Sequence, residues 1–172
     1  KNLGAYLAKK LNREMIMWQG SCQVHVLFAA QELIKLIKQH PDAVVIAHPE
    51  CDDSILMWAH VTGSTSRLLE EVQKNPAKKF IVATETGIFH QMKKLRPDVE
   101  LIQAPVADPG CACNNCPYMK LSSLEKIERA LQTLSPQVNL TEELRLKAKI
   151  SLDRMMQISI DQPVQWPDRF QG

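Results

Sequence analysis

The sequence lacks the features of a membrane-spanning, secreted or nucleic-acid-binding chain. Its 172 residues contain no apolar run of about 18 residues, and the first residues follow neither a signal-peptide nor a transit-peptide pattern. The net charge is only +2, and the Lys and Arg residues are scattered rather than gathered into a basic patch. These absences predict a cytosolic chain with no membrane partner and no nucleic-acid partner.

Cysteine is scarce, yet three of the five cysteines fall within six positions. Cys111, Cys113 and Cys116 form a C-x-C-x₂-C motif, whereas structural zinc sites usually combine two such knuckles. The C-x₂-C pair suits a dithiol, but the surrounding residues do not match a thioredoxin-like motif. An iron–sulfur cluster takes thiolates from distant loops, and Cys22 is a candidate for the distant ligand. The residues alone leave zinc and iron–sulfur both open.

Two further classes of protein remain as alternatives at this point. One is a small zinc-binding interaction module that adds Cys51 or His48 to the cysteine motif. The other is a dithiol redox protein that uses Cys113 and Cys116.

The hydropathy pattern alternates between strands and helices over most of the chain. Short apolar or β-branched runs predict strands over 15–18, 43–48, 79–85 and 99–105. Helical spacing predicts helices over 2–11, 26–38, 54–61, 64–74, 86–95, 122–134 and 141–159. Four methionines are expected to fill the core: Met15, Met17, Met155 and Met156. The alternation predicts an α/β fold with a parallel sheet covered by helices on both faces.

Polar and sulfur side chains follow the expected strands. They are Cys22 with His25, then His48 with Glu50, then Glu85, and finally the cysteine motif, while Ser64 and Thr65 open a helix. Parallel sheets bind ligands beyond the carboxyl ends of their strands, so these groups are expected to face one site. Each group also has a structural interpretation, as a core histidine, a turn or a helix cap. Their coincidence at the strand ends favours the functional interpretation.

Six stretches, in order, closely resemble the quinolinate synthase A family: WQGSCQVH, VVIAHPEC, TGSTS, FIVATETGIFHQM, APVADPGCACNNCPYMKL and LEKI. The resemblance runs from about residue 1 to residue 135. It implies a transferase of de novo NAD biosynthesis that condenses iminoaspartate (iminosuccinate) with dihydroxyacetone phosphate to give quinolinate. It further implies three pseudo-symmetric α/β domains around a [4Fe-4S] cluster, and an aspartate-oxidising enzyme as the source of iminoaspartate.

The resemblance also assigns roles to individual residues. Cys22 and Cys116 match cluster ligands, and the third cysteine ligand lies outside this chain. Residues matching substrate-binding positions are His25, His48, Glu50, Ser64, Thr65 and Lys74. Glu50 is the expected acid or base and His48 its catalytic partner. Cys51 is expected to be buried and non-ligating, and Cys111 and Cys113 to be bystanders, unless Cys113 pairs with Cys116 after cluster loss.

The resemblance divides the chain into three parts. Residues 1–22 match the end of the second α/β domain, 23–110 match the third, and 111–172 match the cysteine loop and C-terminal helices that return to the first domain. The chain is therefore expected to be a partial enzyme that lacks the family's N-terminal region.

Overall fold

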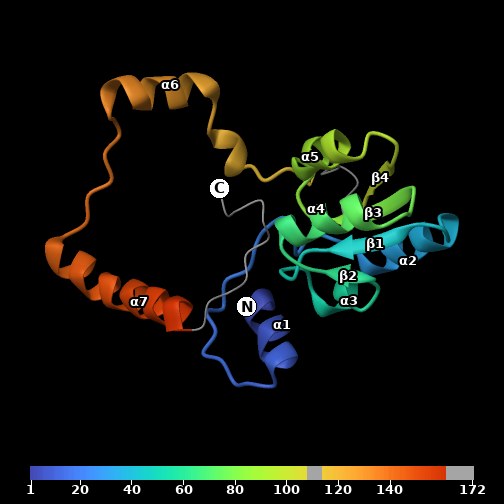
Figure 1. The fold of residues 1–172 in the computed structure, drawn as a ribbon, viewed down its shortest axis with the longest axis horizontal. Coiled ribbons are helices and arrows are strands. Elements are labelled where there is room, and N and C mark those ends of the chain that lie inside the picture. Colours follow the sequence, from blue (N-terminus) through green and yellow to red (C-terminus); the bar gives the residue numbers. More distant parts are fainter. Residues whose placement is uncertain (108–113, 162–172) are drawn as a thin grey trace. The chain divides into compact units, whose positions relative to one another are not determined.

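The computed structural model describes residues 1–107 and 114–161, and the chain divides into two compact units, Lys1–Ser122 and Ser123–Gly172 (Figure 1). Cys111 and Cys113 lie outside the described residues. Each unit is described below by itself.

The first unit is built on a four-stranded sheet in the order β2-β1-β3-β4, with every pair parallel. The strands are β1 (Val44–Ala47), β2 (Val61–Thr62), β3 (Lys79–Ala83) and β4 (Glu100–Gln103). The two central strands pair over their whole common length, from Val44 opposite Phe80 to Ala47 opposite Ala83. Parallel strands buried on both faces require such apolar, β-branched sequences.

Helices cover both faces of this sheet (Figure 1). They are α2 (Ala30–Gln39) and α3 (Asp53–Leu56) on one face, with α4 (Thr65–Lys74) and α5 (Ile88–Leu95) on the other. Successive side chains of β3 alternate between the faces, so that Ile81 packs with the first pair and Phe80 with the second. The predicted α/β fold with a parallel sheet is therefore confirmed.

The strand predicted over 15–18 is wrong. Ile16 and Trp18 are 108% and 88% exposed, and no strand forms over 13–20. A run of four apolar residues has no periodicity, so it does not distinguish a buried strand from an exposed apolar segment. The segment instead connects α1 (Asn2–Leu11) to a turn that begins at Gln23. Asn12 ends α1 in the left-handed conformation that asparagine tolerates.

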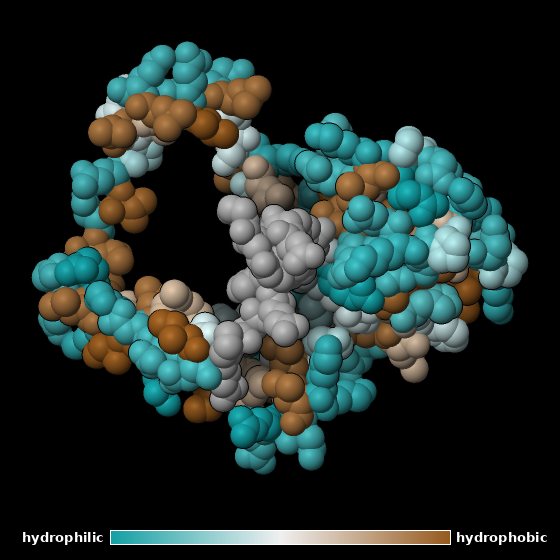
Figure 2. Space-filling view, in the orientation of Figure 1, coloured by the Kyte–Doolittle hydropathy of each residue, from teal (hydrophilic) through white to brown (hydrophobic). Residues whose placement is uncertain are grey.

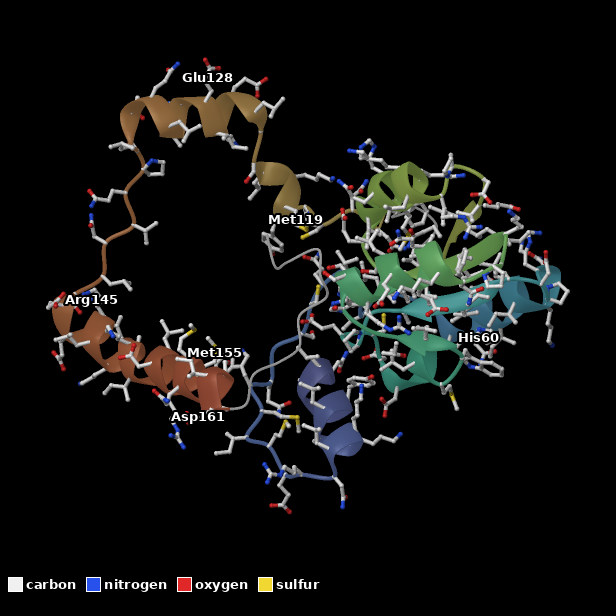
Figure 3. All side chains as sticks on the ribbon, in the orientation of Figure 1. His60, Met119, Glu128, Arg145, Met155 and Asp161 are labelled. Atoms are coloured by element: carbon white, nitrogen blue, oxygen red, sulfur yellow. The ribbon has the colours of Figure 1, made fainter. Side chains whose placement is uncertain are left out.

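Two polar side chains, those of Arg96 and His60, form hydrogen bonds with the backbone of the first unit. The guanidinium of Arg96 donates to the carbonyl oxygens of Val72, Asn75 and Ala77 at 3.1, 2.9 and 3.3 Å. It thereby closes the connection between α4 and β3. The ring of His60 (labelled in Figure 3) accepts a hydrogen bond from the Val45 amide at 2.9 Å and extends the pairing of β1 with β2.

The second unit holds α6 (Leu124–Thr133) and α7 (Glu142–Asp161), and neither helix has a buried residue. Figure 2 shows apolar residues gathered on one side of α6, and Glu128 projects from the opposite side in Figure 3. The expectation that Met155 and Met156 fill a core is wrong, because they are 55% and 56% exposed. In the part of the chain that the structure describes, no helix combines the length and the apolar character needed to cross a membrane.

Candidate active site

The order of the strands fixes where a ligand can bind. The connection from β1 leads to β2 on one side, whereas β3 continues to β4 on the other side. Ligands of such sheets bind in the crevice beyond the carboxyl ends of the two strands at which the order reverses, which here are β1 and β3. His48 directly follows β1 and Thr84 directly follows β3, and the two loops are joined by a hydrogen bond from the His48 amide to the Ala83 carbonyl at 3.1 Å.

Three predicted site residues meet at this crevice. One ligand atom each from Cys22, His25 and Glu50 lies within 4.8 Å of the other two. Cys22 and Glu50 also line a cavity of about 410 Å³, together with Asn2, Trp18 and Ser21. Cys22 and His25 come from the turn region before α2 and Glu50 from the loop after β1, so the fold brings together groups that are distant in the sequence.

His25 is the buried member of this group. Burial, together with the neighbouring His48, lowers the pKa of His25 to about 4, so the ring is neutral at pH 7. Its Nδ1 lies 3.9 Å from Glu50 Oε2, which is too far for a hydrogen bond, and the part of the chain that the structure describes offers this nitrogen no hydrogen-bond partner. The contact with Glu50 is therefore not an ion pair at neutral pH.

The ring of His48 stacks on that of His25, with the ring centroids 4.4 Å apart and an interplanar angle of 18°. Its Nδ1 accepts a hydrogen bond from the Glu50 amide at 3.3 Å. Burial lowers the pKa of His48, and the charge of Glu50 opposes that effect. Two stacked imidazoles are compatible only while at least one of them is neutral, which agrees with both pKa directions.

Two supporting residues were not found from the sequence. The Asn2 side chain donates to the Glu50 carbonyl at 3.0 Å and to Asp52 Oδ1 at 2.7 Å, and so ties α1 to the loop of Glu50. Thr84, only 2% exposed, places its Oγ1 3.0 Å from His25 Nε2. Asn2 gives no local signal, whereas the position of Thr84 immediately after a buried strand could have identified it.

The segment of Cys116 is held against the loop that follows β3. Glu85 accepts hydrogen bonds from the Gly87 amide at 2.7 Å and from the Cys116 amide at 3.4 Å. The Thr86 hydroxyl and Asn115 Oδ1 add a contact of 2.5 Å. Glu85 is therefore more than the local cap expected from the sequence, because it also holds the segment of Cys116.

Three of the five cysteines lie in the described part of the chain. Cys22, Cys51 and Cys116 are free thiols. Cys51 is 1% exposed, donates to the Ala83 carbonyl at 3.4 Å and has its pKa raised by burial to about 12, as suits a structural thiol. The possible pairing of Cys113 with Cys116 lies outside the described residues.

The helix start predicted at Ser64 and Thr65 is present. The Ser64 hydroxyl accepts from the Arg67 amide at 3.4 Å and caps α4, while Thr65 is its first residue, and both are exposed. Lys74 lies at the other end of α4, where its ammonium pairs with Glu70 at 2.7 Å. A helix of this length rises about 14 Å, so the structure does not bring Lys74 to the start of α4. Substrate binding by these three residues stays a prediction.

The chain is similar to known proteins over most of its length. A family model described as quinolinate synthetase A protein matches residues 1–157. The chain is 45% identical over 160 residues to a quinolinate synthase of Nostoc punctiforme, which covers 93% of this chain and 49% of that protein. It is 48% identical over 156 residues to one from Prochlorococcus marinus, covering 91% of this chain and 46% of that protein.

A quinolinate synthase of Chloroherpeton thalassium is 44% identical over 159 residues, which covers 92% of this chain and 49% of that protein. The chain thus spans about half the length of the curated relatives that it matches. With the family model matching most of its residues, the chain belongs to the quinolinate synthase A family.

Proposed function

We propose that this chain provides part of a quinolinate synthase that condenses iminoaspartate with dihydroxyacetone phosphate to quinolinate. The observation that carries the proposal is the convergence of Cys22, His25 and Glu50 at the crevice between β1 and β3. Family membership supports this reaction. The match covers only about half of each relative, which supports a partial enzyme. Residues 111–172 are proposed to return to a domain that lies outside this chain.

The donor set is compatible with the [4Fe-4S] cluster that the family implies. Cys22 is a free, partly buried thiol that lines the cavity, and Cys116 is a second free, partly buried thiol. Thiolates that bind different irons need not touch, so the position of Cys116 outside the Cys22 group is acceptable. With Cys22 and Cys116 as two ligands and a third cysteine from outside, the bound cluster would supply a Lewis-acidic iron.

The chain's own residues supply acid–base chemistry and orientation. Glu50 faces the cavity with its backbone held by Asn2, which suits a carboxylate that takes up or releases protons at a fixed place. The rings of His25 and His48 offer N–H groups to the carboxylates of a bound substrate. The exposed start of α4, at Ser64 and Thr65, suits a further anionic group because free amides and the helix dipole meet there.

Metal analysis tests the cofactor. The chain is purified anaerobically, alone and after joining to the missing half from a relative, and iron, zinc and acid-labile sulfide are measured. We expect about four irons and four sulfides in the joined protein and few in the chain alone. Cys22→Ser and Cys116→Ser should each remove the bound iron. The matched control Cys51→Ser should retain it, because Cys51 lies in the core.

A zinc site is the one competing function with a specific observation behind it. A thiol, an imidazole and a carboxylate within 4.8 Å form a donor set that zinc accepts. Zinc in a one-to-one ratio, with no sulfide, would overturn the cluster proposal and favour this alternative.

Turnover tests the role of Glu50. In the joined protein, Glu50→Gln should lower kcat about 100-fold with unchanged iron content, as expected for loss of a general acid or base. Glu32→Gln, an exposed change on α2, serves as the matched control. Unchanged turnover in Glu50→Gln would remove Glu50 from the mechanism.

A further inference from the structure

The two ring nitrogens of His25 have different surroundings. Nε2 lies 3.0 Å from the hydroxyl oxygen of Thr84, and both groups are buried. Nδ1 is also buried but has no hydrogen-bond partner among the described residues, and Glu50 Oε2 lies 3.9 Å from it. A neutral imidazole carries one N–H, so the direction of the bond to Thr84 decides whether Nδ1 presents a proton or a lone pair on the side of Glu50.

Electrostatics decides between the two directions. If Nε2 donated to Thr84, Nδ1 would present a lone pair toward the Glu50 carboxylate, and two electron-rich groups would face each other. If Thr84 donates to Nε2, the proton sits on Nδ1 and faces the carboxylate, which is favourable. The hydroxyl of Thr84 also needs an acceptor because it is 2% exposed, and His25 Nε2 is its hydrogen-bond partner.

We propose that Thr84 is a positioning residue that donates to Nε2 and fixes His25 as the Nδ1–H tautomer. His25 then acts as a hydrogen-bond donor on the side of Glu50, and its Nδ1 is neither a proton acceptor nor a metal ligand. The unpartnered buried Nδ1–H is satisfied when an acceptor oxygen of a ligand enters. That the ligand is an iminoaspartate carboxylate rests on the proposed function, whereas the tautomer does not.

His48 is fixed as the other tautomer, with its proton on Nε2, by a different donor. Its Nδ1 accepts from the Glu50 amide at 3.3 Å, so in the neutral ring the proton lies on Nε2. The two stacked rings therefore each have one nitrogen occupied by a protein donor and one left as a donor of its own. A side-chain hydroxyl can be removed by mutation but a backbone amide cannot, which makes Thr84 the position to test.

Nitrogen NMR of the imidazoles tests the proposal without any assay of activity. The chain is labelled with ¹⁵N-histidine, and two-bond ¹H–¹⁵N correlations at pH 7.5 identify which nitrogen of each ring is protonated. His25→Gln assigns the His25 signals. We expect the Nδ1–H pattern for His25 in the native chain and in Thr84→Ser, which keeps the hydroxyl. Thr84→Val, which removes it at nearly equal volume, should give shifts averaged between the two tautomers.

The control variant is Thr62→Val, at a partly buried threonine of β2, which should leave the pattern unchanged. Amide dispersion in each spectrum reports whether the variant is folded. An Nε2–H pattern in the native chain would overturn the proposal, and so would an unchanged Nδ1–H pattern in folded Thr84→Val. If Thr84→Val does not fold, the pattern in the native chain and in Thr84→Ser still decides the direction of the bond.

Kinetics in the joined protein separates this inference from the proposed function. Thr84→Val should lower kcat/KM about 10-fold with unchanged iron content, and Thr84→Ser should restore it, because the hydrogen-bond partners that hold a site histidine in place have effects of this size. A joined protein without quinolinate synthase activity would refute the proposed function and leave the tautomer standing. A fully active, folded Thr84→Val would overturn the positioning role alone.

Discussion

The two units of the chain differ in how their apolar side chains are used. In Lys1–Ser122, two clusters fill both faces of the sheet, with Phe80 and Leu33 among the side chains that are fully buried. In the described part of Ser123–Gly172, no apolar side chain is buried, and Leu131 is 74% exposed. Both units carry helical periodicity, so the comparison teaches that periodicity predicts a helix and its apolar side without naming what covers that side.

The largest expected effect comes from opening the core of the first unit. Phe80→Ala removes a fully buried ring from β3 and should lower the free energy of unfolding by about 3–5 kcal/mol. Urea unfolding followed by circular dichroism measures the change. A loss below about 1 kcal/mol would show that the sheet unit is not the cooperative core described here.

The next largest effect distinguishes the two units by their response to pH, because all five histidines lie in the first unit. The pKa of His25 falls from 6.5 when unfolded to about 4 when folded. Above pH 6.5 the His25 ring is neutral in both states and does not lower the stability. As the pH falls toward 4, the unfolded chain takes up a proton that the folded chain does not, and the free energy of unfolding falls by up to about 3 kcal/mol. Urea unfolding at pH 7, 6, 5 and 4 should show this slope. His25→Gln should flatten it, and the exposed His90→Gln should not.

Arginine replacements compare polar networks across the two units. Arg96→Ala leaves the Val72, Asn75 and Ala77 carbonyls without their donor and should cost about 2 kcal/mol. The matched change in the second unit, Arg145→Ala, removes only an exposed pair with Glu142 and should cost less than about 0.5 kcal/mol. Equal losses in the two variants would contradict the difference in packing between the units.

The smallest effect should come from the apolar side of α6. In the chain alone, Leu131→Ala should change the free energy of unfolding by less than about 0.5 kcal/mol, because the side chain has little packing to lose. Joining the missing half should raise that cost if the added part covers α6. An equal, negligible cost in both proteins would argue against the return of residues 111–172 to another domain.

The local parts of the fold were predictable from the sequence. The β-branched run of β3 and the serine that caps α4 identify their elements without outside information. The two-residue strand β2 was not predicted because so short an element has no sequence pattern. Residues 15–18 were wrongly predicted as a strand because four consecutive apolar residues have no periodicity that separates a strand from an exposed segment.

The candidate site was predictable only in part. Cys22, His25 and Glu50 follow from motifs, and the structure brings them together. Asn2 and Thr84 contact their partners across 48 and 59 residues of sequence, so no local pattern reveals these contacts, although the place of Thr84 directly after β3 marks it as a candidate. Such contacts exist only once the parallel strands have paired.

The side chain of Asn2 connects the first helix to the loop that carries Glu50. It is the first residue of α1, and it holds the Glu50 carbonyl and Asp52 at the same time. Both hydrogen bonds run from one side-chain amide, so a single group anchors the loop of Glu50 to the start of α1.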